Sequence, residues 1–150
     1  MRQAVETAKE IARRSAEVML RQDAASRSLG MLLEDVAPGV ARVSMVVRED
    51  MVNGHGICHG GLLATLADTA FAVACNSHGE MTVAAGFDIT FLEPGRLGDR
   101  LLAGAVERAR RGRSGLYDVT VIRRDPDGSA DGLVLAEFRG RSRSLGRPIA

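Results

Sequence analysis

The chain has 150 residues, the size of one domain around one core. Its composition, 45% hydrophobic and 26% charged, excludes a disordered chain, and no apolar run approaches the ~20 residues that span a bilayer. Cys58 and Cys75 exclude a disulfide framework, and the charged N-terminal stretch lacks a signal peptide's apolar core. A net charge of +1 attracts no nucleic acid. We expect one cytoplasmic domain over residues 1–150, without nucleic-acid or membrane partners.

The first half of the chain predicts two helices and two strands. Apolar residues at a spacing of three and four predict an amphipathic N-terminal helix over about residues 3–22. Two apolar stretches, 31–36 and 40–47, flank the Pro38-Gly39 turn and predict a hairpin. After a polar loop at 48–58, the stretch 62–77 is long, Ala-rich and free of Gly and Pro, which predicts a buried helix.

The second half predicts strands at 82–92, 100–109, 116–124 and 133–142. Their short connections leave no room for crossover helices, so the strands should pair antiparallel. The Asp-rich turn at 125–132 lacks the final Glu and the flanking helices of a calcium-binding EF-hand. The expected fold class is α+β, with a sheet of five or six strands wrapped around one long apolar helix.

The candidate chemistry lies between residues 52 and 79. One carboxylate, Asp68, falls inside the apolar helix, where ionisation is costly unless the charge is paired. It is either a helix-edge or Arg-paired structural residue, or a desolvated base or nucleophile. Gly60 and Gly61 precede the helix, and two glycines there either cap it or let a substrate carbonyl reach the free N–H groups of its first turn. The second interpretation predicts an oxyanion site for acyl transfer.

Two other chemistries, a metal site and a cysteine nucleophile, have less support from these residues. His55 and His59 could share a metal with Asp68, but no HxH or HExxH spacing supports it, so we expect no metal. Cys58 is followed by His59, but a neighbour in sequence is not thereby positioned to take the proton of the thiol. Cys58 is therefore a poorer candidate for the nucleophile than Asp68.

The spacing of Gly60 and Asp68 predicts a two-chain site. Eight residues along a helix correspond to about 12 Å, too far for a carboxylate to act on a carbonyl held at Gly60. If the two groups cooperate, Asp68 must come from a second copy. Antiparallel helices about a twofold axis would give two equal sites per homodimer.

At these residues the chain resembles a known family. The motifs NGHGxCHGG (53–61) and LADTAFAxACNS (66–77) are similar to those of hotdog-fold acyl-CoA thioesterases of the PaaI type, which belong to phenylacetate catabolism. Matches at FLEPGRLGDRL (91–101), GRSGLYDVTV (112–121) and FRGRS (138–142) extend the resemblance over nearly the whole chain. It implies a hotdog fold, an antiparallel β-sheet wrapped around a long central α-helix, and homodimers that pair into homotetramers with CoA at a subunit interface.

The resemblance also implies roles for single residues. The Gly60 N–H would polarise the thioester carbonyl, His59 would place the loop, and Asn53 would hold the attacking water or the thioester. Asp68 of the facing subunit would be nucleophile or general base. The implied reaction is hydrolysis of an acyl-CoA, such as (hydroxy)phenylacetyl-CoA, to free acid and CoA. It needs no cofactor, because CoA is part of the substrate.

Further substrate contacts are predicted from charge and position. Gly61 would join Gly60 at the carbonyl, and Arg111, Arg113 and, more weakly, Arg141 would bind the CoA phosphates in fork geometry. A solvated Arg-rich turn is the alternative. Two other functions stay open on this fold, a non-catalytic acyl-CoA-binding protein and a 3-hydroxyacyl-thioester dehydratase. The first would not need Asp68, and the second requires a His–carboxylate pair that fits the motif less well.

Overall fold

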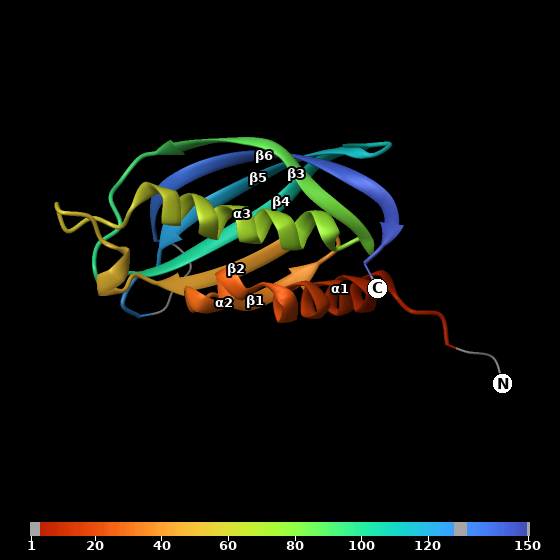
Figure 1. Cartoon of the computed structure of the whole chain (residues 1–150), viewed down its shortest axis with the longest axis horizontal. Helices are drawn as coiled ribbons and strands as arrows, with labels where there is room; N and C mark the ends of the chain where they lie inside the picture. The colour runs from red at the N-terminus through yellow and green to blue at the C-terminus, as the bar shows by residue number, and fades with distance from the viewer. Residues whose placement is uncertain (1–3, 128–131, 150) are drawn as a thin grey trace.

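The computed structural model describes residues 4–127 and 132–149 as one antiparallel sheet with helices on one face (Figure 1). The strand order is β1-β2-β4-β5-β6-β3. The elements, in chain order, are α1 (Ala8–Gln22), α2 (Ala24–Ser28), β1 (Leu32–Ala37), β2 (Val40–Val46), the 3-10 helix η1 (Glu49–Met51), α3 (Gly60–Asn76), β3 (Glu80–Phe91), β4 (Arg100–Arg111), β5 (Ser114–Arg123) and β6 (Leu133–Pro148).

Helix α3 lies lengthwise in the curve of the sheet, and the core is formed between them (Figure 1). Ten of its residues are buried, including Leu66, Ala70 and Phe71, because small Ala side chains let the helix approach the strands closely. The ring of Phe71 contacts Tyr117 and Phe138 on β5 and β6, with ring centroids 5.4 and 5.7 Å away. The predicted α+β hotdog arrangement of a sheet around a long central helix is therefore confirmed.

The N-terminal helix is shorter than predicted and is followed by a second helix that the sequence did not predict. Thr7 ends the preceding extended chain because it forms a capping box with Glu10, so α1 begins at Ala8. The start predicted near residue 3 lies outside the described residues. Asp23 ends α1 and caps α2 by accepting a hydrogen bond from the backbone of Ser26.

The strands lie where they were predicted, with small shifts at their ends. Strand β6 runs to Pro148 rather than to residue 142, because its pairing with β3 continues to Glu80. The predicted turn at 125–132 lies partly outside the described residues. Within the described ranges, none of the helices combines the length and the apolar character needed to cross a lipid bilayer. The cytoplasmic location stays a prediction.

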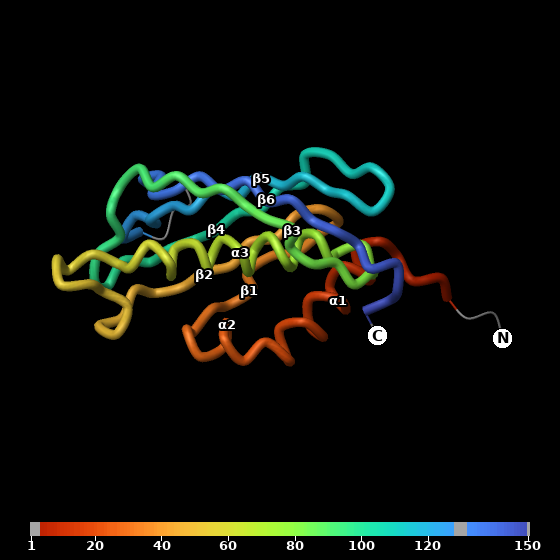
Figure 2. The backbone as a smooth tube through the Cα atoms, turned by 45° about the horizontal axis from the view of Figure 1, so that its top comes forward, coloured from red at the N-terminus to blue at the C-terminus, as the bar shows by residue number. Residues whose placement is uncertain are grey.

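The two edges of the sheet differ. Helix α1 packs along the β1 edge, as the red and orange segments of the tube view show (Figure 2). Strand β3 forms the other edge, and it carries exposed apolar side chains: Val83, Phe87 and Phe91 are 45%, 40% and 50% exposed. A long apolar edge strand is a template for pairing with another chain. The β3 edge is therefore the place where a second copy could extend the sheet.

Candidate active site

The N-terminus of α3 offers backbone donors to a ligand. The loop before it is held by the His59 N–H, which donates to the Met51 carbonyl at 2.8 Å, and the His59 carbonyl accepts from Leu62 and Leu63. The N–H groups of Gly60 and Gly61 donate to no acceptor among the described residues. His59 is the N-cap but makes no side-chain capping bond. Two free N–H groups at the positive end of a 17-residue helix can stabilise an oxyanion.

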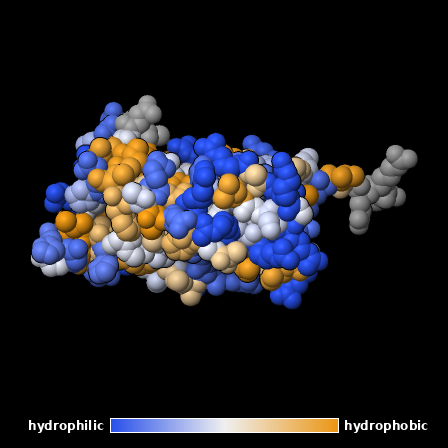
Figure 3. All heavy atoms as spheres, turned by 90° about the horizontal axis from the view of Figure 1, so that it is seen from above, coloured by the Kyte–Doolittle hydropathy of each residue, from blue (hydrophilic) through white to orange (hydrophobic). Residues whose placement is uncertain are grey.

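A cavity of about 320 Å³ opens beside Gly60. Its wall is formed by the 53–58 loop, the start of α3 and the end of β3, with Asn53, Ile57, Cys58, Gly60, Leu63, Phe91, Leu92, Glu93 and Pro94 as lining residues. A Cβ atom at residue 60 would lie 3.0 Å from the tip of the Phe91 ring. Glycine is therefore required for close packing here, and any larger side chain would displace the ring or fill the cavity. Seen from above, apolar side chains gather at this end of the molecule (Figure 3).

Asn53 shapes the loop and keeps its amide group available. Its Oδ1 accepts from the backbone N–H groups of His55 and Ile57 at 2.9 and 3.2 Å, which closes the loop on itself. With Oδ1 engaged, the NH₂ group has no acceptor among the described residues, and Asn53 is one of the residues that line the cavity. Asn53 can therefore donate to a thioester or to a water molecule beside Gly60.

Asp68 lies in the middle of α3 and is half-buried. No described residue donates a hydrogen bond to its carboxylate or forms an ion pair with it, so the Arg-paired structural alternative does not hold for this part of the chain. Burial raises the pKa of Asp68, and the nearby Asp23 carboxylate raises it further. A desolvated carboxylate without a partner is suited to accept a proton or to attack a carbonyl.

Gly60 and Asp68 are the first and ninth residues of the same continuous helix. Their separation along the axis is therefore about 12 Å, as the sequence predicted. Within one chain the structure brings Asn53 and Gly60 together at the cavity. Gly61, the next residue of α3, is exposed and is not among the lining residues, and Asp68 also lies outside the lining.

The alternative chemistries find no support in the described residues. No group of three or more His, Cys, Asp or Glu is arranged there to hold a metal ion. Cys58 lines the cavity but is only 2% exposed, and burial raises the pKa of its thiol, which disfavours the thiolate. Burial likewise raises the pKa of the Cys75 thiol, to about 12.

Known proteins resemble this chain over most of its length. The model of the thioesterase superfamily matches residues 55–130. Over 135 residues the chain is 41% identical to acyl-coenzyme A thioesterase PaaI of Escherichia coli strain K12, covering 90% of this chain and 92% of the relative. The chain belongs to the thioesterase superfamily. The predictions of a PaaI-type resemblance and of a thioester hydrolase are thereby confirmed.

Solved structures of this superfamily agree with the fold. The structure of the E. coli PaaI protein from the phenylacetic acid degradation operon aligns with a TM-score of 0.87 at 39% identity, over 95% of this chain and 99% of that one. A mutant of phenylacetic acid degradation protein PaaI from Thermus thermophilus aligns with a TM-score of 0.75 at 36% identity, over 82% and 100%.

The arginines predicted to bind CoA lie away from the cavity of this thioesterase-superfamily chain. Arg111 ends β4 and Arg113 lies in the β4–β5 turn. This turn is at the opposite end of the molecule from the start of α3 in the ribbon and tube views (Figures 1 and 2). Arg141 forms a surface ion pair with Asp88 at 2.9 Å. The structure does not bring these three residues to Gly60 within one chain.

Two features near the site were missed from the sequence. Phe91 packs against Gly60 through a contact between residues 31 positions apart, and no local pattern indicates it. Asp23, three residues before Ser26, carries an N-cap signature that could have predicted α2. Nothing in the sequence indicates that this cap would lie beside α3.

Proposed function

We propose that this protein hydrolyses acyl-CoA thioesters at a site shared by two copies of the chain. The observation that supports this most is the free N–H group of Gly60 in the cavity that Asn53 also lines. A carboxylate without a partner among the described residues, Asp68, lies about 12 Å along the same helix. The curated relative's name, acyl-coenzyme A thioesterase, supplies the substrate class.

In this proposal the thioester carbonyl points at the Gly60 N–H, and Asn53 orients the thioester or the water. Asp68 of the second copy takes a proton from water as the water oxygen attacks the carbonyl carbon. The oxyanion forms at Gly60 and collapses, the C–S bond breaks, and the CoA thiolate leaves and is protonated. Alternatively, Asp68 attacks the carbonyl carbon, the C–S bond breaks and the CoA thiolate leaves, which gives a mixed anhydride. Water then attacks the Asp68 carboxyl carbon and releases the free acid. A single turnover in ¹⁸O-water labels Asp68 only by this second route.

The open β3 edge supports the shared site. Antiparallel pairing of two β3 strands about a twofold axis would cover Val83, Phe87 and Phe91 and would run the two α3 helices in opposite directions. Each Gly60 would then approach the other copy's Asp68. We extend the proposal to the tetramer expected from the resemblance, a pair of such dimers.

We expect aryl-acetyl groups to be the preferred substrates. Two of the similar structures are PaaI proteins named for phenylacetic acid degradation. In a thiol-release assay over acetyl-, medium-chain, palmitoyl-, benzoyl-, phenylacetyl- and hydroxyphenylacetyl-CoA, the last two should exceed palmitoyl-CoA in kcat/KM by at least about tenfold. A higher value for palmitoyl-CoA would contradict the preference, and no thiol release from any of them would contradict the function.

We expect Arg111 and Arg113 to act from the partner chain. A twofold axis reverses the second copy, so its β4–β5 turn would lie at the same end as the first copy's Gly60. The double variant Arg111→Ala/Arg113→Ala should raise KM about tenfold, reduce its dependence on salt and leave kcat nearly unchanged. Arg13→Ala/Arg21→Ala removes the same charge from α1 and serves as the control. An equal KM in both variants would assign Arg111 and Arg113 to the solvated surface.

A further inference from the structure

A short chain of hydrogen bonds joins the N-terminal helices to α3 beside Asp68. Both carboxylate oxygens of Asp23 accept from Ser26, Oδ1 from the backbone N–H at 2.9 Å and Oδ2 from the hydroxyl at 2.6 Å. The Ser26 hydroxyl lies 2.8 Å from the Thr69 hydroxyl, and both side chains are buried. Thr69 follows Asp68 directly. A single hydroxyl therefore separates the Asp23 carboxylate from the helix turn that carries Asp68.

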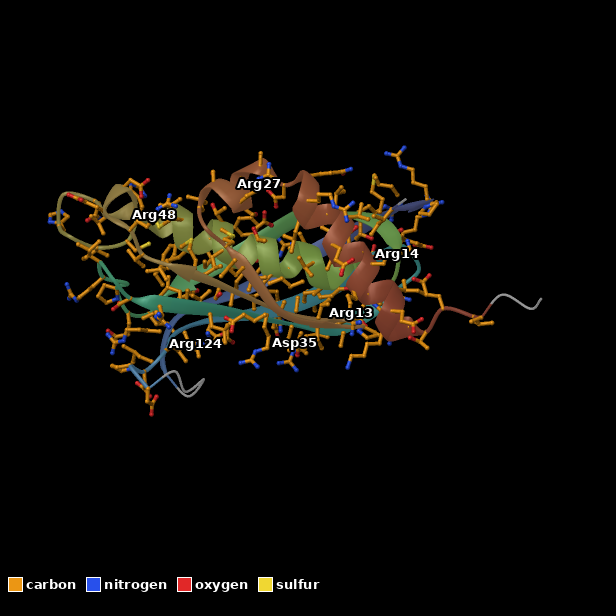
Figure 4. The ribbon with its side chains drawn as sticks, turned by 90° about the horizontal axis from the view of Figure 1, so that it is seen from below. Arg13, Arg14, Arg27, Asp35, Arg48 and Arg124 are labelled. Carbon is orange, nitrogen blue, oxygen red and sulfur yellow. The ribbon has the colours of Figure 1, made fainter. Side chains whose placement is uncertain are left out.

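Asp23 is held as a fixed negative charge at this place. Both of its oxygens accept a short hydrogen bond from Ser26, which fixes the orientation of the Asp23 side chain. The arginines of the same segment do not compensate for it at Asp68. Arg13, Arg14 and Arg27 extend from α1 and α2 on the exposed side of the helices (Figure 4), and Arg14 is paired with Glu6.

The groups that act electrostatically on Asp68 are few. Among the described residues, Asp23 on the α2 side is the charge that affects the pKa of Asp68, and it adds to the effect of burial. On α3 itself, burial raises the pKa of the Cys75 thiol and the Asp68 carboxylate raises it further, so this thiol adds no charge near Asp68. No cation from the described strands packed against α3 offsets these effects.

We propose that Asp23 is a positioning residue of the site, acting on Asp68 through its fixed charge and through the Ser26–Thr69 contact. The proposal rests on the proposed role of Asp68. Helix capping alone does not account for a charge at residue 23, because Asn caps a helix as well as Asp does. The negative charge of Asp23 makes Asp68 a stronger proton acceptor near neutral pH. The contact between the Ser26 and Thr69 hydroxyls holds α3 at a constant distance from Asp23.

The substitution Asp23→Asn removes the charge and keeps the capping acceptor for the Ser26 N–H, while its NH₂ group replaces the oxygen that accepts from the Ser26 hydroxyl. The acid limb of the kcat/KM profile reports the group that must lose its proton, and it should move to lower pH by about half a unit or more in Asp23→Asn. Added salt should shift the limb in the wild type more than in the variant. Asp35→Asn, the same change at an exposed residue of β1 (Figure 4), should leave the limb in place. Asp23→Ser also keeps a capping oxygen and replaces Asp23→Asn if that variant does not fold.

A stability cycle gives a second readout that does not depend on turnover. Asp68→Asn should raise the urea midpoint at pH 7 by less in the Asp23→Asn background than in the wild type, because less repulsion is left to relieve. The proposal would be overturned if Asp68→Asn raised the urea midpoint equally in both backgrounds and Asp23→Asn left the acid limb in place. It would also be overturned if Asp35→Asn moved the acid limb as far as Asp23→Asn does. Failure of the proposed function would instead appear as no thiol release by the wild type, and the stability cycle would still decide whether the two carboxylates are coupled.

Discussion

Asp68→Asn should reduce kcat for acyl-CoA hydrolysis by about 10²–10⁴, the range expected for a lost acid–base group. The amide has the shape of the carboxylate but can neither accept a proton nor form an acyl intermediate. No described residue depends on Asp68 as a hydrogen-bond acceptor, so the fold should remain intact. Thiol release under saturating substrate measures the loss, and circular dichroism checks the fold.

The same variant should be at least as stable as the wild type at neutral pH. Because the pKa of Asp68 is raised in the folded state, its ionised form costs folding free energy above that pKa and costs nothing below the unfolded value. The stabilising effect of Asp68→Asn should therefore be larger at pH 7 than at pH 4 in urea unfolding. Asp35→Asn is the matched control for both measurements. More than about a tenth of wild-type kcat in Asp68→Asn would make Asp68 structural and the mechanism wrong.

Mixing two inactive chains should restore activity. One chain carries Asp68→Asn, and the other carries Gly60→Val, whose side chain would meet the tip of Phe91 and block the carbonyl site. In a heterodimer one site contains both lesions and the other contains neither. With random pairing of equal amounts, half of the chains lie in heterodimers, so activity should recover to roughly a quarter of the wild-type level.

The subunits are exchanged in mild denaturant and refolded together, and differently tagged chains allow the heterodimer to be isolated and assayed. Each homodimer alone, taken through the same treatment, is the control. Isolated heterodimers without activity would show that Gly60 and Asp68 act within one chain or do not act together. Recovery in the unmixed controls would show that the lesions are incomplete.

Much of the site could be predicted because its signals are local. Gly60 and Gly61 stand at the start of a long apolar segment, and Asp68 is the one carboxylate inside it, so periodicity and residue type were sufficient to identify them. The helix spacing that separates Gly60 from Asp68 is a property of any α-helix and needs no tertiary information. The ends of elements were less certain, because capping by Thr7 and pairing of β6 with Glu80 depend on individual contacts.

The sequence by itself determined the α+β class, the central helix, the Gly60–Asp68 spacing and the absence of a disulfide framework, because each follows from composition or from a repeat of a few residues. Only the tertiary structure decided that Phe91 packs against Gly60 and that the N-terminal segment brings Asp23 near Asp68. It also decided that the turn with Arg111 and Arg113 lies at the end of the molecule opposite the cavity. These are contacts and separations between segments distant in the chain. They are set by how the sheet curves around α3 and by where α2 docks, and both depend on the packing of the whole core rather than on any local pattern.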